Sequence, residues 1–256
     1  MGGDVDWLEL QRRWDAQQET YLPDREQRFS VMLDAVEASV GDAPRVLDLA
    51  GGTGSISQRV LHRFPAARTV IVDIDAALLQ IARGTFDGDD RVRVVSADLA
   101  SPEWIETLGE PADGFDAVLT ATALHWLTGD RVAGVYAEAG SLLRKGGVLI
   151  NADHMVDPDL AQLGIAFSTY SSEQEKRRQS VAGAEDWTGW WVGLREIPEL
   201  AEAVAERDRR FAERDSHHTE LDVPSSWHLD ALRSGGYVEA GLLWRSFTDA
   251  AVIGLR

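Results

Sequence analysis

The sequence predicts an α/β fold, a Rossmann-like, doubly wound and mostly parallel sheet covered by helices. Apolar, strand-like runs recur at 46–48, 69–73 and 92–98, helix-like segments separate them, and a glycine-rich turn follows the first run. Strands that alternate with helices are typical of βαβ units, which build parallel sheets. A chain of 256 residues with 44% hydrophobic content can bury one sizeable core. That size favours one domain with an insertion.

The N-terminal segment, residues 5–40, is predicted to form two helices around Pro23. Trp7, Leu10 and Trp14 recur at helical spacing in the first, and a similar apolar stripe runs from Phe29 to Val36 in the second. Proline fits at the first turn of the second helix, because its fixed φ suits that position.

The segment VLDLAGGTG (46–54) is the most informative in the chain. A strand-like run ends in Asp48 and leads through Gly51, Gly52 and Gly54 into the helix-like SISQRVLHRF. Glycines permit a tight turn and let the backbone approach a ligand, and the N-terminus of a helix favours a carboxylate or phosphate. This loop is therefore predicted to hold a small anionic or zwitterionic cofactor.

Acids close three successive strands, at Asp48, Asp73 and Asp98. The carboxyl ends of parallel strands share one edge of the sheet, so these side chains are expected to face one cleft. Asp73 is spaced to accept hydrogen bonds from a ribose diol. Any one of the acids alone could instead be a helix cap or a solvated loop residue, and Asp75 is predicted to cap the helix AALLQIAR.

These motifs resemble the class I S-adenosylmethionine-dependent methyltransferases, strongly over 45–152 and weakly over 225–256. The resemblance implies a seven-stranded sheet with an antiparallel C-terminal strand, and S-adenosyl-L-methionine as cofactor. It also implies site roles: Asp48, Ala50, Gly52 and Gly54 around the methionine end, Asp73 on the ribose, Ile74 on the adenine, Asp98 and Leu99 at the exocyclic amine, and Thr120 and Ala121 again at the methionine end. Ala50 stands where many members carry a glycine, which predicts slight crowding and not loss of the site.

The resemblance extends to the later strands. FDAVLTATALHWL (115–127) is similar to the family's fourth strand and following loop, and LLRKGGVLINAD (142–153) to the next turn and fifth strand. A short helix around SSWHLDALRSGG then leads to two strand-like runs within YVEAGLLWRSFTDAAVIGLR. By resemblance these runs form the antiparallel final pair that distinguishes methyltransferases from dehydrogenases.

The insertion at 155–223 has no strand pattern and is predicted to be helical. Trp187, Trp190, Trp191 and Leu194 form one stripe, which Leu200, Val204 and Phe211 continue. Such a stripe is usually core, but an insertion after the fifth strand lies on the ligand side, so some aromatics are candidates to roof a substrate pocket. The predicted organisation is therefore N-terminal helices (1–41), a cofactor-binding core (42–154 and 224–256) and a helical lid (155–223).

Tyr21 and Arg25 lie one helical turn apart. By analogy with the family they would reach the cofactor carboxylate from the N-terminal helices. A plain Tyr–Arg pair on the surface is the alternative.

His125 and His154 are the candidate catalytic bases. Methyl transfer from a sulfonium mainly requires positioning and exclusion of water, but a base helps when the acceptor is a hydroxyl, carboxyl, amine or carbon acid. Both histidines follow strand ends on the cofactor side, whereas His62, His217, His218 and His228 are expected on helices or exposed acidic loops. A metal site at His125, Asp153 and His154 would have no recognisable ligand spacing, so no metal is expected.

The charge balance disfavours polyanionic partners. The formal net charge is −18, and nucleic acid or anionic lipid would need a basic patch. The clusters 176–178 and 207–210 are interleaved with acids and are predicted to be solvated helix faces. The absence of cysteine excludes disulfides and thiolate metal sites. We expect a cytoplasmic protein, because no apolar signal core or membrane-length run is present.

The resulting hypothesis is a methyltransferase that acts on an O, N or C atom of a small, apolar or aromatic molecule, with a role in secondary metabolism and with a homodimer left open. The segment ALHWL is also similar to methyltransferases of small carboxylates such as trans-aconitate. An NAD(P)-dependent oxidoreductase is one alternative, since Gly52, Gly54 and Asp73 fit a dinucleotide fingerprint, although its third glycine would fall at Ser57. A catalytically inactive cofactor-binding partner protein is the other.

Overall fold

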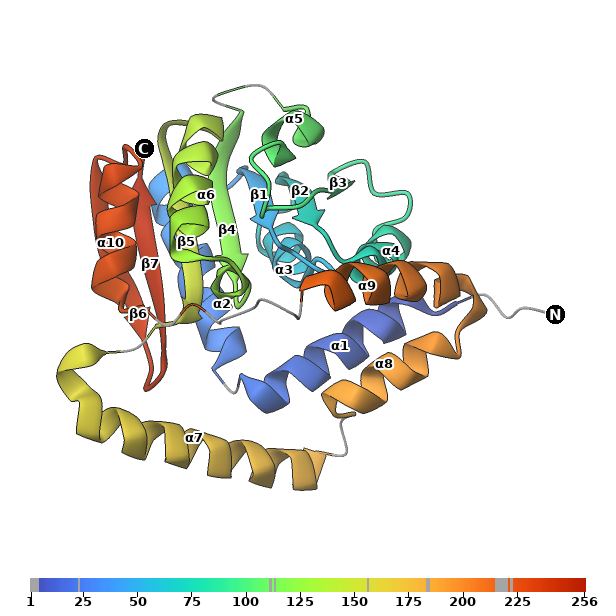
Figure 1. The fold of residues 1–256 in the computed structure, drawn as a ribbon. Coiled ribbons are helices and arrows are strands. Elements are labelled where there is room, and N and C mark those ends of the chain that lie inside the picture. The colour runs from blue at the N-terminus through green and yellow to red at the C-terminus, as the bar shows by residue number, and fades with distance from the viewer. Residues whose placement is uncertain are drawn as a thin grey trace.

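A seven-stranded sheet organises the computed structural model, which describes residues 5–22, 24–110, 112, 114–155, 157–182, 185–214, 221 and 223–256. The strand order is β3-β2-β1-β4-β5-β7-β6 (Figure 1). The strands are β1 (Arg45–Leu49), β2 (Arg68–Asp73), β3 (Val92–Ser96), β4 (Phe115–Ala121), β5 (Leu143–His154), β6 (Glu239–Arg245) and β7 (Asp249–Leu255).

Strands β1 to β5 pair in parallel, and β7 runs antiparallel to both of its neighbours, β5 and β6. The prediction of a mostly parallel seven-stranded sheet with an antiparallel C-terminal strand is confirmed. In the register of β5 and β7, His154 lies directly opposite Asp249.

Helices cover both faces of the sheet. On one side lie α2 (Arg25–Val40), α3 (Ser55–Arg63) and α4 (Ala76–Thr85), and on the other α5 (Trp104–Leu108), α6 (Gly129–Leu142) and α10 (Ser225–Ser234). Successive side chains of β1 point to opposite faces of the sheet and enter different apolar clusters. Val46 packs with α2 and α3, whereas Leu47 and Leu49 pack with α6. This is the period-two pattern of a strand that is buried on both faces.

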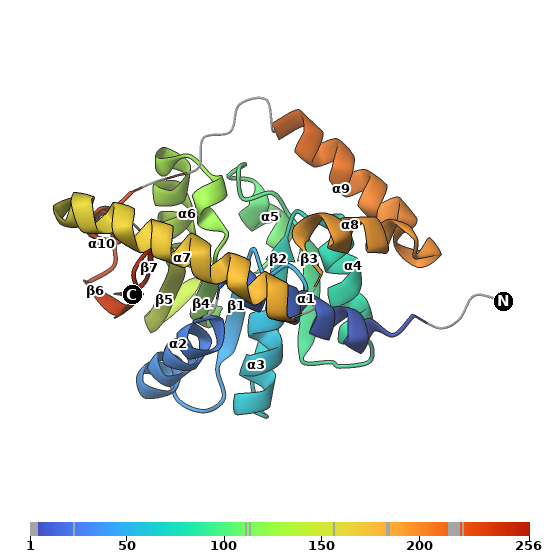
Figure 2. The same cartoon turned by 90° about the horizontal axis from the view of Figure 1, so that it is seen from below.

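The remaining helices lie beyond the carboxyl ends of the parallel strands, which point toward them in Figure 1. They are α1 (Trp7–Tyr21), α7 (Ala161–Ala182), α8 (Trp187–Arg195) and α9 (Ala201–Arg214), with short 3-10 turns η2 (Pro158–Leu160) and η3 (Pro198–Leu200). Figure 2 shows α7 and α1 crossing beneath the sheet edge. The two predicted N-terminal helices are confirmed as α1 and α2, while Pro23 lies outside the described residues.

A separate apolar cluster joins this cap to the core. Trp190, Trp191 and Leu194 of α8 are buried against α1 and against Ala77, Leu78 and Ile81 of α4. The packing interpretation of the tryptophan stripe is therefore confirmed for these three residues. Trp187 differs, because it remains 44% exposed while contacting Trp14 and Trp191.

The prediction of a solvated face at 207–210 is wrong for Arg207. Its Nε donates to Asp75 Oδ2 at 2.9 Å, and its guanidinium carbon lies 3.5 Å from the Trp191 ring centroid. Arg207 thus ties α9 to the start of α4. Charge alternation along the sequence could not show this, because both partners come from distant segments.

None of the described helices is long and apolar enough to cross a lipid bilayer.

Candidate active site

The glycine loop between β1 and α3 has the tight geometry that its sequence predicts. A Cβ on Gly51 would lie 2.7 Å from Asp48 Cγ, and one on Gly54, where φ is +82°, would lie 2.7 Å from Ile71 and Phe86. Ala50 also adopts a positive φ, 55°. The consequence of alanine at this position is therefore backbone strain.

Asp48 lies beneath this loop with no exposed surface. Its Oδ2 accepts hydrogen bonds from Ser57 N–H at 2.9 Å and Ser57 Oγ at 2.7 Å. Its Oδ1 has no partner among the described residues. Burial raises the pKa of Asp48 to about 6, against the opposing effect of the Ser57 hydrogen bonds.

Asp73 ends β2 and faces the glycine loop. Its Oδ2 accepts a hydrogen bond from Gly52 N–H and its Oδ1 one from Asp75 N–H, both at 2.8 Å. Burial raises the pKa of this carboxyl as well. A carboxylate has about four lone-pair sites, so each oxygen keeps the capacity to accept a ribose hydroxyl.

Two residues follow Asp73 before helix α4 begins. Ile74 is half-buried, and Asp75 caps α4 by accepting from Ala77 N–H at 3.0 Å and Leu78 N–H at 3.1 Å. The capping interpretation of Asp75 is therefore confirmed.

The predicted residues after β3 and β4 lie at the same edge of the sheet. Asp98 is half-buried and accepts from Ala100 N–H at 2.8 Å. Leu99 is buried, and its carbonyl accepts a hydrogen bond from Arg131. Thr120 is buried, with an Oγ1 that has no partner in the described part of the chain, and the half-buried Ala121 ends β4.

Helix α1 covers the start of α3 through polar contacts. Asp15 Oδ1 accepts from Ser55 Oγ at 2.7 Å and from Arg25 Nη1 at 2.8 Å, and Asp15 Oδ2 pairs with Arg59 at 3.2 Å. The fully buried Gln11 donates to Ser55 Oγ at 3.1 Å, and its Oε1 lacks a partner within the described structure.

Tyr21 and Arg25 do not form the surface pair that was one of the two alternatives. Arg25 is 6% exposed and bonded to Asp15, while Tyr21 Oη accepts from Trp187 N–H at 3.0 Å. That alternative is wrong, because α1 shields Arg25 and α8 engages Tyr21. Both residues remain within the layer that covers the carboxyl edge of the sheet.

His125 forms a buried pair with Asp153. It lies in the 3-10 turn η1 (Leu124–Trp126) after β4 and is 6% exposed. Its Nδ1 is 2.7 Å from Asp153 Oδ1, and its backbone N–H donates to Oδ2 at 3.2 Å. The hydrogen bond and charge of His125 lower the pKa of Asp153 in spite of burial. A carboxylate held this way fixes the orientation of the imidazole.

His154 ends β5 and forms a second pair. Its Nδ1 is 2.9 Å from Asp249 Oδ1, and Asp249 in turn pairs with the buried Arg28 at 3.0 Å. The hydrogen bond to Asp249 is the main cause that raises the pKa of His154. The rings of His125 and His154 have centroids 5.2 Å apart.

Sequence reasoning grouped both histidines with Asp153 only as a metal site, and it missed Asp153, Asp249 and Arg28 as hydrogen-bond and ion-pair partners. A signal for the His125–Asp153 pair existed, since His125 follows the end of β4 and Asp153 lies at the end of the adjacent β5. Asp249 could be predicted as the partner of His154 only from the register of the antiparallel β5–β7 pair, which the sequence did not show. Nothing in the sequence pointed to Arg28.

Potential metal-ligand atoms of His125, Asp153 and His154 lie within 4.8 Å of one another. However, the Nδ1 of each histidine is at hydrogen-bond distance from a carboxylate oxygen. Such distances fit shared protons, and the arrangement is that of two His–Asp pairs.

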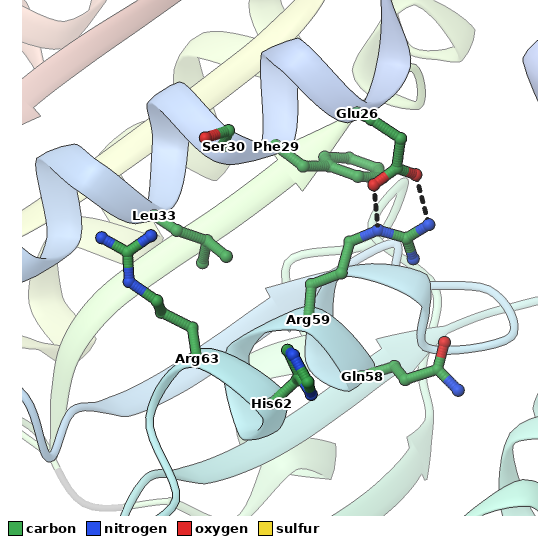
Figure 3. A pocket seen from close by; sticks show the side chains of 8 residues that line it. All are labelled: Glu26, Phe29, Ser30, Leu33, Gln58, Arg59, His62 and Arg63. Carbon is green, nitrogen blue, oxygen red and sulfur yellow. Dashed lines mark hydrogen bonds and ion pairs between the residues drawn. The ribbon is translucent and has the colours of Figure 1, made fainter.

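A groove of about 540 Å³ lies between α2 and α3, with Arg59 paired to Glu26 across it (Figure 3). Its lining, which includes Phe29, His62 and Arg63, contains none of the predicted site residues.

Comparisons with known proteins find methyltransferases. Residues 46–147 match the family described as a methyltransferase domain. The trans-aconitate 2-methyltransferase of Acidovorax sp. strain JS42 is 34% identical over 108 residues, which cover 42% of this chain and 37% of the relative. The release factor glutamine methyltransferase of Chlorobaculum tepidum is 31% identical, over 42% of this chain and 45% of the relative. The chain thus spans less than half the length of these curated relatives.

Solved structures show the same fold over nearly the whole chain. An O-methyltransferase family protein from Burkholderia thailandensis superposes with a TM-score of 0.58 and 21% identity, covering 95% of this chain and 59% of the other. A methyltransferase in complex with the Haloferax volcanii Trm112 activator gives a TM-score of 0.56 and 14% identity, over 95% and 96%.

Residues 46–147 therefore match a methyltransferase domain, and the described chain has the Rossmann-like fold of solved methyltransferases.

Proposed function

We propose that this protein transfers a methyl group from S-adenosylmethionine to a small molecule that gives up a proton to His125. The observation that carries the proposal is the buried His125–Asp153 pair, at 2.7 Å, at the strand edge that also carries the glycine loop and Asp73. One edge of the sheet therefore combines residues suited to a nucleoside with a candidate base.

The residues around the loop fit the cofactor's chemistry. The cofactor carries a cationic ammonium, and two buried acceptors, Asp48 Oδ1 and Gln11 Oε1, lack donors within the described structure. Asp73 would hold the ribose, with Ile74, Asp98 and Leu99 around the adenine and Thr120 and Ala121 toward the methionine end. Arg25 would contribute positive charge for the carboxylate. When bound, the cofactor supplies an electrophilic methyl group on sulfur.

The protein's own contribution is to position the acceptor and accept its proton. Asp153 holds Nδ1 of His125, so the ring would take up a proton at Nε2. The resulting imidazolium would then be stabilised by the buried carboxylate. Exclusion of water falls to the helices beyond the sheet edge, and we accordingly assign 155–223 as a lid, 1–41 as a pocket wall, and 42–154 with 224–256 as the cofactor-binding core.

The methyl acceptor is proposed from the names of relatives. Relatives carry the names trans-aconitate 2-methyltransferase and malonyl-[acyl-carrier protein] O-methyltransferase, so small carboxylic acids are the first acceptors to test.

The test is turnover with isotopically labelled S-adenosylmethionine and a panel of such acids, for wild type and His125→Asn. We expect turnover to fall roughly ten- to a thousandfold in the variant while cofactor affinity stays nearly unchanged, as for loss of a general base. His62→Asn on α3 is the matched control. Turnover within about twofold of wild type across neutral pH would refute the role of His125. Cofactor binding without turnover on any acceptor would instead support an inactive partner protein.

A further inference from the structure

The second histidine pair is built differently from the first. His154 keeps 46% of its side chain exposed, whereas the side chain of His125 is 7% exposed. Nδ1 of His154 pairs with Asp249 at 2.9 Å, and no described residue forms a hydrogen bond or ion pair with its other ring nitrogen, Nε2. His154 is therefore anchored from inside the protein and can present an N–H group to a ligand.

Two further residues contact the carboxylate that anchors His154. Asp249 accepts from Thr248 Oγ1 at 2.7 Å and pairs with Arg28, which is 2% exposed and lies 5.3 Å from the Trp244 ring centroid. The guanidinium of Arg28 offsets the charge of Asp249, while the hydrogen bond to Asp249 favours the protonated form of the His154 imidazole.

Charged or titratable groups face His154 from four elements. They are Asp153 on β5, Asp249 on β7, Arg28 on α2 and the titratable His125 on η1. Asp153 is committed to His125 Nδ1 and to the backbone N–H groups of His125 and His154. The hydrogen bond to Asp249, followed by the charges of Asp249 and Asp153, raises the pKa of His154, while burial and Arg28 oppose this.

We propose that His154, fixed by Asp249 and Arg28, binds a carboxylate group of the methyl acceptor and holds that acceptor beside His125. This inference rests on the proposed function and names the class of its substrate. The two rings, 5.2 Å apart, then have separate roles: His125 takes a proton and His154 supplies a charge-assisted hydrogen bond. On a protein with a formal net charge of −18, an anionic acceptor needs such a local cation.

Calorimetry in the presence of saturating S-adenosylhomocysteine tests this, with malonate and trans-aconitate each compared with the corresponding amide. Wild type should bind at least one acid and discriminate against its amide. His154→Gln keeps a polar side chain but no cation, and should weaken binding of that acid by about tenfold or more. His62→Gln, at an exposed position of α3, should change nothing.

The pH dependence separates anchoring from mere packing. Binding of the acid should weaken as pH rises through the raised pKa of His154. Asp249→Asn should move this loss to lower pH, because the anchor that favours the imidazolium is removed.

Three outcomes overturn the inference: no binding of either acid, equal binding of acid and amide, or an unchanged preference in His154→Gln. A preference that disappears with a chelator and returns with zinc also overturns it, in favour of a metal at His125, Asp153 and His154. If wild type fails to bind S-adenosylhomocysteine, the proposed function itself falls. Normal binding of that nucleoside together with failure of the acids rejects this inference alone.

Discussion

At the scale of single residues, the charge of Asp48 works against the stability of the fold. Its pKa in the folded protein is about 6, well above the ordinary value of 3.8. The folded state therefore holds a proton that the unfolded state releases. The stability that this proton supplies is fully present below about pH 4 and is lost as pH rises through 6.

Asp48→Asn should consequently stabilise the protein at pH 7.5 by up to about 3 kcal/mol, since two pKa units correspond to about that free energy. The gain should shrink toward zero near pH 4. Urea unfolding at both pH values measures it, with Asp42→Asn as an exposed control. A variant no more stable than wild type at pH 7.5 would show that the buried charge is compensated in another way.

Ala50 gives a second prediction at this scale. Because its φ is 55°, Ala50→Gly should remove left-handed strain and raise the free energy of unfolding by about 1 kcal/mol. Ala137→Gly, at an exposed position of α6, should lower it by a similar amount, because glycine weakens a helix interior. The same sign for both substitutions would refute strain at Ala50.

The positions of these acids at strand and helix ends were predictable, but the partners that distant segments supply were not. Asp48, Asp73 and Asp75 stand at strand and helix ends, which local sequence patterns mark. The pairing of Arg25 with Asp15, or of His154 with Asp249, depends on how separate elements dock. Spacing along one segment carries no information about that docking.

At the scale of elements, the helical stripes predicted α8 and its buried tryptophans, but the sequence did not show where the fifth strand begins. The segment LLRKGGVLINAD was predicted to hold a turn and the fifth strand, and β5 already begins at Leu143. Leu143 pairs with Phe115 across a register shift, and Gly146 adopts a φ of +79° within the strand. The first residues of such an irregular strand have a turn-like composition, so the sequence does not show that the strand has begun.

The attachment of α9 to α4 predicts how the cap moves. Arg207→Gln would remove the ion pair with Asp75 and the contact with the Trp191 ring. Hydrogen exchange should then become faster in α8 and α9 and stay unchanged in α6. Arg209→Gln is the control, since Arg209 is exposed and pairs only with Glu206 among the described residues. Equal exchange in both variants would mean that apolar packing alone holds the cap.

At the scale of the whole molecule, the alternation of strands and helices made the sheet predictable. The edge of the sheet at which the insertion lies was also predictable, because the insertion follows the fifth strand. A chain that leaves β5 at its carboxyl end emerges at the ligand edge, where α7, α8 and α9 lie (Figure 1). The packing of α1 between this insertion and the glycine loop was not predictable. It rests on aromatic contacts of Trp14 with Trp187 and Trp190 that span more than half the chain.

The central claim is that the glycine loop and Asp73 bind S-adenosylmethionine. Thermal unfolding with S-adenosylhomocysteine or with NAD tests it most directly, because a ligand at about 100 times its Kd stabilises the native state by about 2.7 kcal/mol. We predict a Tm increase of roughly 5–10 °C with S-adenosylhomocysteine, none with NAD, and a much smaller increase for Asp73→Ala. No increase with S-adenosylhomocysteine, or an equal increase with NAD, would contradict the claim.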